Sequence, residues 1–245
     1  MSNSVIIHEL AKHDLKGAIL IDGFPGVGLV GTIVANFLIN TLKLKQIGVI
    51  DSQRFPPISV IKEGEPHNPM RLYAGEQICN DGTCNQVAVC VSEFTPPGEI
   101  TKDLVKTLLN WAEKKGSNEI IILDGVASSK HDNKVFCAAE ADLCRIMEDN
   151  GIEMIPQGFI TGISGGILNE CLIRKIKGVV LLAKANESLP DSLASVTLIE
   201  AINKTYGMKI DTDELKKQEK QIGNDLKELS DQYSEHKKLD SNMYM

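Results

Sequence analysis

The sequence predicts an α/β layered protein with a mostly parallel sheet flanked by helices. Apolar runs of four or five residues, at 18–21, 120–123 and 179–183, are typical of strands that are buried on both faces. Stretches with helical periodicity lie between such runs and end at glycine, as 101–115 does before Gly116. Strands that alternate with helices in this way indicate crossover connections and a parallel sheet.

The full set of elements expected from the sequence is as follows. Apolar and β-branched composition predicts strands at 5–10, 18–21, 47–50, 58–61, 70–79, 86–91, 120–123 and 179–183. Apolar residues at three- and four-residue steps predict helices at about 32–42, 101–115, 138–150, 167–177 and 191–206. Asn80-Asp81-Gly82 is a hairpin signal between two of these strands, so we also expect some antiparallel pairing.

The chain is expected to contain one large domain followed by a helix and a tail. No Ser/Gly-rich linker interrupts residues 1–210, which therefore form the predicted α/β core domain. Residues 211–240 are dominated by charged side chains with a narrow apolar stripe, which predicts a charged C-terminal helix. This helix either lies on the domain surface or packs against another subunit and forms an oligomer. Residues 241–245 are expected to be a flexible tail.

Composition excludes several classes of partner and cofactor. A formal net charge of −7 argues against nucleic-acid and membrane-surface binding, because phosphate groups attract basic faces. No apolar run is long enough to span a bilayer, and the N-terminus lacks a signal-peptide pattern, so a cytoplasmic protein is expected. The six cysteines contain no Cys-x-x-Cys pair and the five histidines are scattered, so neither disulfides nor a metal site is expected.

A glycine-rich loop follows the strand at 18–21 and resembles a dinucleotide fingerprint. Gly26, Gly28 and Gly31 have the G-x-G-x-x-G spacing, and Asp51 ends the next strand, as the fingerprint requires. However, four residues separate the strand from Gly26, which makes the loop longer than the fingerprint expects. The alternatives are a nucleotide- or nucleoside-binding enzyme that uses this loop, and a turn that lets a helix begin close to the sheet. The second is favoured, so no cofactor is expected.

A second motif, G-x-S-x-G, spans Gly162 to Gly166 and places Ser164 where a hydrolase would have its nucleophile. The acid of a triad would be Asp191, and the only later histidine is His236 in the charged C-terminal segment. The competing interpretation is that Ser164 caps the following helix. We therefore assign no catalytic residue, and interpret Glu93 and Glu99 as solvated loop acids.

The chain ends in Met243-Tyr244-Met245, an apolar residue, a tyrosine and a terminal residue with a free carboxylate. Such an end is suited to capture in a pocket that holds the carboxylate with a lysine and the ring in a slot. These three residues are the predicted partner-binding site.

Several segments together resemble the proteasome assembly chaperone 2 family, in particular its archaeal homologues. The similarity extends over about residues 15–220. The matching segments are Gly23-Phe24-Pro25-Gly26-Val27-Gly28-Leu29-Val30-Gly31, Pro96-Pro97 with Trp111-Ala112, Gly158-x-x-x-Gly162-x-Ser164-Gly165, Leu181-Leu182-Ala183 with Pro190-Asp191, and Asp211-Thr212-Asp213-Glu214-Leu215.

This resemblance implies a fold like that of purine nucleoside phosphorylases, without a retained active site. It also implies a non-enzymatic homo-oligomer that binds the α subunits of the 20S proteasome as an assembly chaperone or activator. In that role, Met243 would make the apolar contact and Tyr244 would insert its ring and hydroxyl between α subunits. The carboxylate of Met245 would pair with a pocket lysine.

Overall fold

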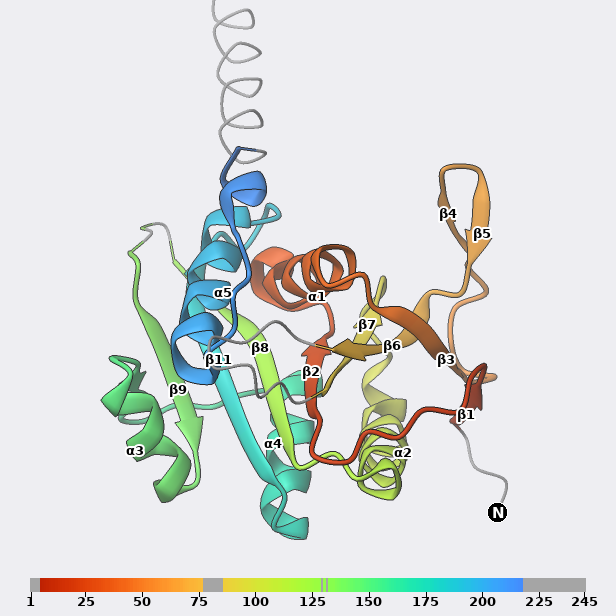
Figure 1. Cartoon of the computed structure of the whole chain (residues 1–245), viewed down its shortest axis with the longest axis horizontal. Helices are drawn as coiled ribbons and strands as arrows, with labels where there is room; N and C mark the ends of the chain where they lie inside the picture. The colour runs from red at the N-terminus through yellow and green to blue at the C-terminus, as the bar shows by residue number, and fades with distance from the viewer. Residues whose placement is uncertain (1–4, 77–85, 129, 131, 218–245) are drawn as a thin grey trace, which may run out of the picture. The chain divides into compact units, whose positions relative to one another are not determined.

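The computed structural model describes residues 5–76, 86–128, 130 and 132–217 of the chain. The chain divides into two units, Met1–Ile210 and Asp211–Met245. The first unit is built on a nine-stranded sheet with helices on both faces (Figure 1). In the second unit, helical backbone begins at Asp213 and continues to Lys217, where the described part ends. Most of the expected charged helix, and the tail, lie outside the described residues.

The large sheet contains β1 (Ile6–Glu9), β2 (Ile19–Gly23), β3 (Lys45–Asp51), β6 (Met70–Glu76), β7 (Gln86–Ser92), β8 (Glu119–Ala127), β9 (Val135–Ala139), β10 (Glu153–Met154) and β11 (Lys177–Ala185). A separate hairpin contains β4 (Val60–Lys62) and β5 (Glu65–His67). The helices are α1 (Val30–Thr41), α2 (Thr101–Lys115), α3 (Ala141–Asp149), α4 (Gly162–Arg174) and α5 (Ser192–Tyr206), with short 3-10 turns η1 (Val27–Leu29) and η2 (Gly98–Ile100).

The strand order β1-β3-β6-β7-β2-β8-β11-β9-β10 shows a mixed sheet, so the expectation of a mostly parallel sheet is wrong. Parallel pairing is confined to the central strands β7, β2, β8 and β11 and to the short pair β9–β10. The pairs β1–β3, β3–β6, β6–β7 and β9–β11 are antiparallel. Parallel neighbours need a crossover connection of a dozen or more residues, and fewer than that separate Glu76 at the end of β6 from Gln86 at the start of β7. The predicted antiparallel pairing of these two strands is confirmed, although their connection lies outside the described residues.

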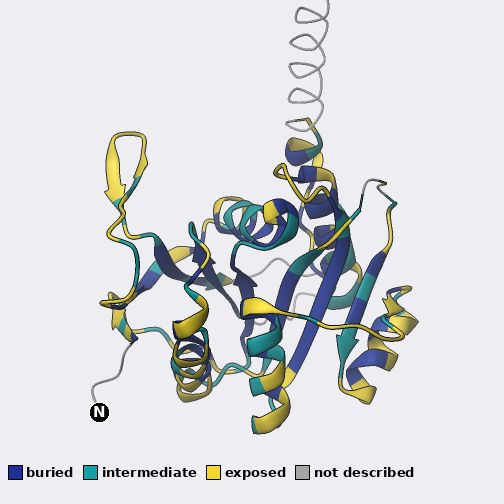
Figure 2. Cartoon of the chain, turned by 180° about the vertical axis from the view of Figure 1, so that it is seen from behind, coloured by how far each residue is buried: buried dark blue, intermediate teal, exposed yellow. Residues whose placement is uncertain are grey.

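The core lies on both faces of the central strands. Helices α1 and α5 contact one face and each other, while α2 and α4 contact the other (Figure 1). On the α2–α4 face, Leu20 of β2 and Ile120 and Ile122 of β8 pack in one buried cluster with Leu104 and Leu108 of α2. Figure 2 shows that the central strands are buried along most of their length. The apolar runs are thus explained by cover on both sides.

Three strands, β5, β9 and β10, are not expected from the sequence. The helix predicted at 138–150 begins only at Ala141, because Ala138 and Ala139 belong to β9, which pairs with β11. Burial alternates along β9, with Val135 and Cys137 buried and Phe136 between them half-buried. That period of two is typical of a strand, but it is only five residues long and its signal is weak.

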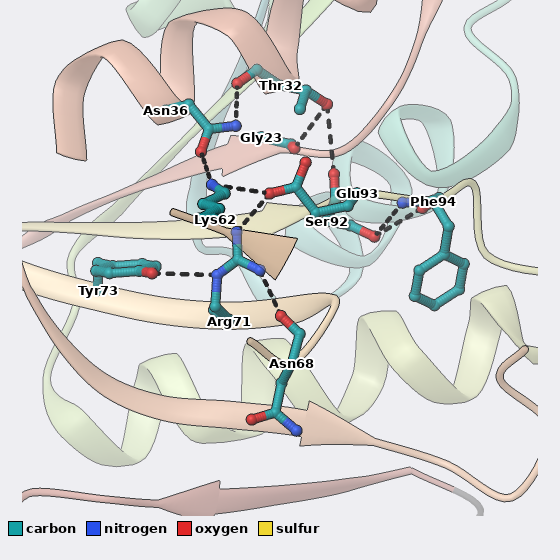
Figure 3. Close-up of polar contacts among 10 residues, drawn as sticks. All are labelled: Gly23, Thr32, Asn36, Lys62, Asn68, Arg71, Tyr73, Ser92, Glu93 and Phe94. Carbon is teal, nitrogen blue, oxygen red and sulfur yellow. Dashed lines mark hydrogen bonds and ion pairs between the residues drawn. The ribbon is translucent and has the colours of Figure 1, made fainter. Parts of the chain in front are cut away.

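A buried arginine organises the polar contacts beside the β4–β5 hairpin (Figure 3). The Arg71 side chain is 1% exposed and forms an ion pair with Glu93, while its Nε donates to the Tyr73 hydroxyl at 3.1 Å. Glu93 also pairs with Lys62 of β4, whose Nζ lies 3.3 Å from the carboxylate and 3.3 Å from Asn36 Oδ1 of α1. The interpretation of Glu93 as a solvated loop acid is therefore wrong.

Candidate functional site

The glycine loop, the β7–α2 connection and the start of α4 meet at one cavity of about 390 Å³. It lies at the carboxyl ends of the parallel strands β2 and β8, where ligands bind in open α/β sheets. The residues that line it are Pro25, Gly26, Val27, Thr95, Pro96, Gly98, Thr101, Asp124, Thr161, Gly162, Ile163 and Ser164. Segments that seemed unrelated in the sequence therefore form one site.

Asp124, near the end of β8, holds this site together. Its Oδ1 accepts hydrogen bonds from the N–H groups of Val27, at 3.2 Å, and Gly125, at 2.8 Å. Its Oδ2 accepts the hydroxyl hydrogen of Ser164 at 2.7 Å. One carboxylate thus links the glycine loop and the first turn of α4 to the sheet by hydrogen bonds. Hydrogen bonds to an ionised acceptor are stronger than neutral ones, so these contacts rigidify the cavity wall.

The three glycines of the loop are required because parts of the protein lie against them. A Cβ on Gly26 would lie 2.1 Å from Asp124 Oδ1, and one on Gly31 would lie 2.7 Å from the Leu123 carbonyl oxygen. Gly28 has φ +64°, which favours glycine, and a Cβ there would lie 2.8 Å from that of Ala185. The loop is therefore a turn that brings α1 close to the sheet, as the favoured interpretation expects.

The strand–helix–strand unit of a dinucleotide site is not formed around this loop. In such a unit the strand after the helix lies beside the first, yet β6 and β7 separate β3 from β2. Asp51, the acid that ends the strand after the loop, lies at the position where the fingerprint has its ribose-binding acid, but β3 pairs there with Ile6 of β1. The space beside Gly26 contains the Asp124 carboxylate, which would repel a pyrophosphate.

A second carboxyl group, that of Asp22 in β2, lies buried near the site. Its Oδ1 accepts the Phe24 N–H at 3.0 Å, and its Oδ2 has no hydrogen-bond partner. Burial raises the pKa of Asp22 to about 8; the Phe24 N–H opposes this shift and the charge of Asp124 adds to it. Asp22 is therefore mostly protonated at neutral pH. On the neighbouring strand, burial also raises the pKa of the Cys90 thiol.

Ser164 is not presented as a hydrolase nucleophile. It lies inside the first turn of α4, and the preceding residues 158–161 form no strand. Asp191 caps α5 by accepting the Ala194 N–H at 2.9 Å, and His236 lies outside the described residues. The interpretation that Ser164 caps α4 is also wrong, because the N-cap is Thr161, which makes no side-chain cap hydrogen bond.

We expect Ser164→Ala to lower the free energy of unfolding by about 1 to 2 kcal/mol, because a buried hydroxyl that donates to a carboxylate is lost. Ser128→Ala is a matched control, since the Ser128 hydroxyl is less buried and donates to the Lys130 carbonyl, an uncharged acceptor, at 2.8 Å. It should change stability by less than about 0.5 kcal/mol. Urea unfolding of both variants measures the difference, and equal losses would contradict the role of Asp124 as a fastening group.

The predicted tail residues Met243, Tyr244 and Met245 lie outside the described residues. Within the described part of the chain, no three His, Cys, Asp or Glu side chains gather as metal ligands. None of the described helices is both long and apolar enough to cross a membrane.

These observations define an α/β protein in which the space beside the loop glycines is occupied by other groups of the same chain. The chain belongs to the PAC2 family, whose model matches residues 20–230, and the resemblance noted in the sequence is confirmed. A curated relative is an uncharacterized protein of Methanocaldococcus jannaschii, 30% identical over 95% of this chain and 94% of the relative.

Similar crystal structures are known from Pyrococcus furiosus. PbaA, described as an archaeal homolog of proteasome-assembly chaperone, is 29% identical, with a TM-score of 0.84 and 97% of both chains covered. PbaB, described as an archaeal proteasome activator, has a TM-score of 0.81 over 93% of this chain and 99% of its own. At 22% identity, PbaB supports the likeness of fold only. The likeness to purine nucleoside phosphorylases stays a prediction.

Proposed function

We propose that this chain is a non-enzymatic, homo-oligomeric proteasome-assembly chaperone or activator-like protein of the cytoplasm. The observation that carries the proposal is the similarity to PbaA over 97% of both chains. The space beside the loop glycines is occupied by the chain itself, and the Ser164 hydroxyl donates to Asp124. Both observations agree with a protein that performs no catalysis at these motifs.

The proposed partner is the α ring of the 20S proteasome, and the proposed contact is the tail. Met243 supplies an apolar contact, Tyr244 a ring and hydroxyl, and Met245 a terminal carboxylate for a lysine of the partner. A contact of three residues is weak by itself. Several tails on one oligomer bind together with much higher avidity, so tail docking and oligomerisation belong to one proposal.

We expect the intact chain to retain 20S α subunits in a pull-down, and a chain that lacks residues 243–245 to lose them. Tyr244→Ala should weaken retention strongly, because the ring and hydroxyl are lost, whereas Ser241→Ala is the matched control and should bind normally. Mass measurement in solution should give a multiple of the 26.8 kDa chain for every variant. Equal retention of the intact and truncated chains would refute tail docking, and a monomeric mass would refute the oligomer.

A further inference from the structure

The cavity beside Asp124 has a lining whose chemistry is not used by the proposed chaperone function. Four lining residues carry hydroxyl groups: Thr95, Thr101, Thr161 and Ser164. Among the described residues that line the cavity, Asp124 is the one with a charged side chain. The Thr101 hydroxyl donates to the Pro97 carbonyl at 3.3 Å, so its oxygen remains able to accept. Neither lysine nor arginine is among the lining residues, which disfavours an anionic ligand.

Apolar groups complete the walls of the cavity. Pro25, Val27, Pro96 and Ile163 lie among the hydroxyls, so the site combines flat apolar surface with hydrogen-bonding groups. Small-molecule sites are typically concave, of about 300 to 1,000 Å³, with mainly apolar walls and a few convergent polar groups. A volume of about 390 Å³ is sufficient for a single small molecule with a ring and several hydroxyls.

An unusually exposed aromatic residue lies on the loop that leads into the site. Phe159 is 99% exposed and is two residues before the lining residue Thr161, on the exposed connection between β10 and α4 (Figure 2). Full exposure of a phenyl ring is unfavourable in water, since burial of such a side chain gains about 1.5 to 3 kcal/mol. The flanking Gly162 has φ +66° and open space around its Cβ position. The ring is thus available to stack on a flat ligand.

We propose that this cavity binds a neutral nucleoside. One sugar hydroxyl donates to Asp124 Oδ2 and the others exchange hydrogen bonds with the threonine hydroxyls, while the base lies against the proline walls and stacks on Phe159. A phosphorylated ligand is excluded by the single negative charge and the lack of a lining cation. This ligand site differs from a dinucleotide loop, because the Val27 N–H donates to Asp124 rather than to a phosphate.

The test is calorimetric titration of the full chain with adenosine, guanosine, cytidine and uridine, and with ribose and adenosine monophosphate as comparison ligands. At least one nucleoside should bind saturably, and ribose should bind more weakly than that nucleoside. Adenosine monophosphate should bind more weakly than adenosine. Phe159→Ala should weaken nucleoside binding about tenfold, in line with the loss of base stacking. Ile173→Ala, which truncates an exposed side chain of α4 that does not line the cavity, should leave it unchanged.

Gly98 offers a graded way to block the cavity without distorting the fold. It lines the cavity, its φ is outside the left-handed region, and a Cβ there meets no atom within 4 Å. Gly98→Ala should bind nucleoside normally, and Gly98→Leu should not, with unchanged unfolding midpoints. Failure of all four nucleosides to bind, tight binding of the monophosphate, or equal binding by the Gly98→Leu and intact chains would overturn the proposal. Proteasome retention is measured separately and depends on neither result.

Discussion

We expect the titration of Asp22 to lower the free energy of unfolding of the intact chain by roughly 4 kcal/mol between pH 4 and pH 7, and Asp22→Asn to abolish this decrease. The pKa of Asp22 is about 8 in the folded protein and about 3.9 when unfolded. Between these values the folded state binds more protons than the unfolded state, so stability falls as pH rises. Above pH 8 both states are ionised and this contribution becomes constant.

The measurement is urea unfolding of both chains at intervals from pH 4 to pH 9, because the other titrating groups cancel in the comparison. The two curves should nearly coincide at pH 4 and diverge with the variant more stable, and the difference should level off above pH 8. The introduced amide keeps an oxygen that can accept the Phe24 N–H, so the loop contact survives. A control, Asp14→Asn, changes an exposed acid and should shift the curve by less than about 0.5 kcal/mol. Parallel curves for the intact chain and Asp22→Asn would refute the buried neutral carboxyl.

Glu93→Gln is expected to lower the free energy of unfolding by about 2 to 3 kcal/mol. The change keeps the side-chain size but leaves the Arg71 guanidinium, 1% exposed, without this counter-charge. Removal of one partner from a fully buried pair costs about 3 to 5 kcal/mol. The smaller value applies here because 22% of the Glu93 side chain remains exposed, so water screens part of the effect.

Lys62→Met provides the matched control for this network. Lys62 is 46% exposed and its pairing with the same carboxylate should contribute less than about 1 kcal/mol. Chemical unfolding of the two variants at pH 7 should therefore give clearly different losses. A loss for Lys62→Met as large as that for Glu93→Gln would show that the exposed pair, rather than the buried arginine, dominates the network.

Local pattern was enough to predict the layered α/β class and most of the elements. The apolar runs of β2, β8 and β11 have no polar position because helices cover both faces, and that is visible in a short window of sequence. Strand direction is different, since it depends on which strands become neighbours. Nothing local to β9 shows that it pairs antiparallel with β11, so the sequence predicts some antiparallel pairing but not its extent.

The site was only partly predictable, for a similar reason. The spacing of Gly26, Gly28 and Gly31 indicated a tight approach, but the atoms that approach belong to distant residues. Asp124 lies 97 residues from Val27 and 40 from Ser164, and no local pattern connects them. The signal that was available is an acid directly after the apolar run 120–123, as Asp22 follows 18–21.

The place of β2 in the middle of the sheet has a consequence for the order of folding. Ile19 is synthesised well before both of its partners, Val87 on one side and Glu119 on the other. This strand remains unpaired until the segments of β7 and β8 have been made, and non-local pairing of this kind slows folding. We therefore expect slow refolding of the isolated chain and aggregation of N-terminal fragments that end before β8, so this protein is itself at risk of misfolding during synthesis.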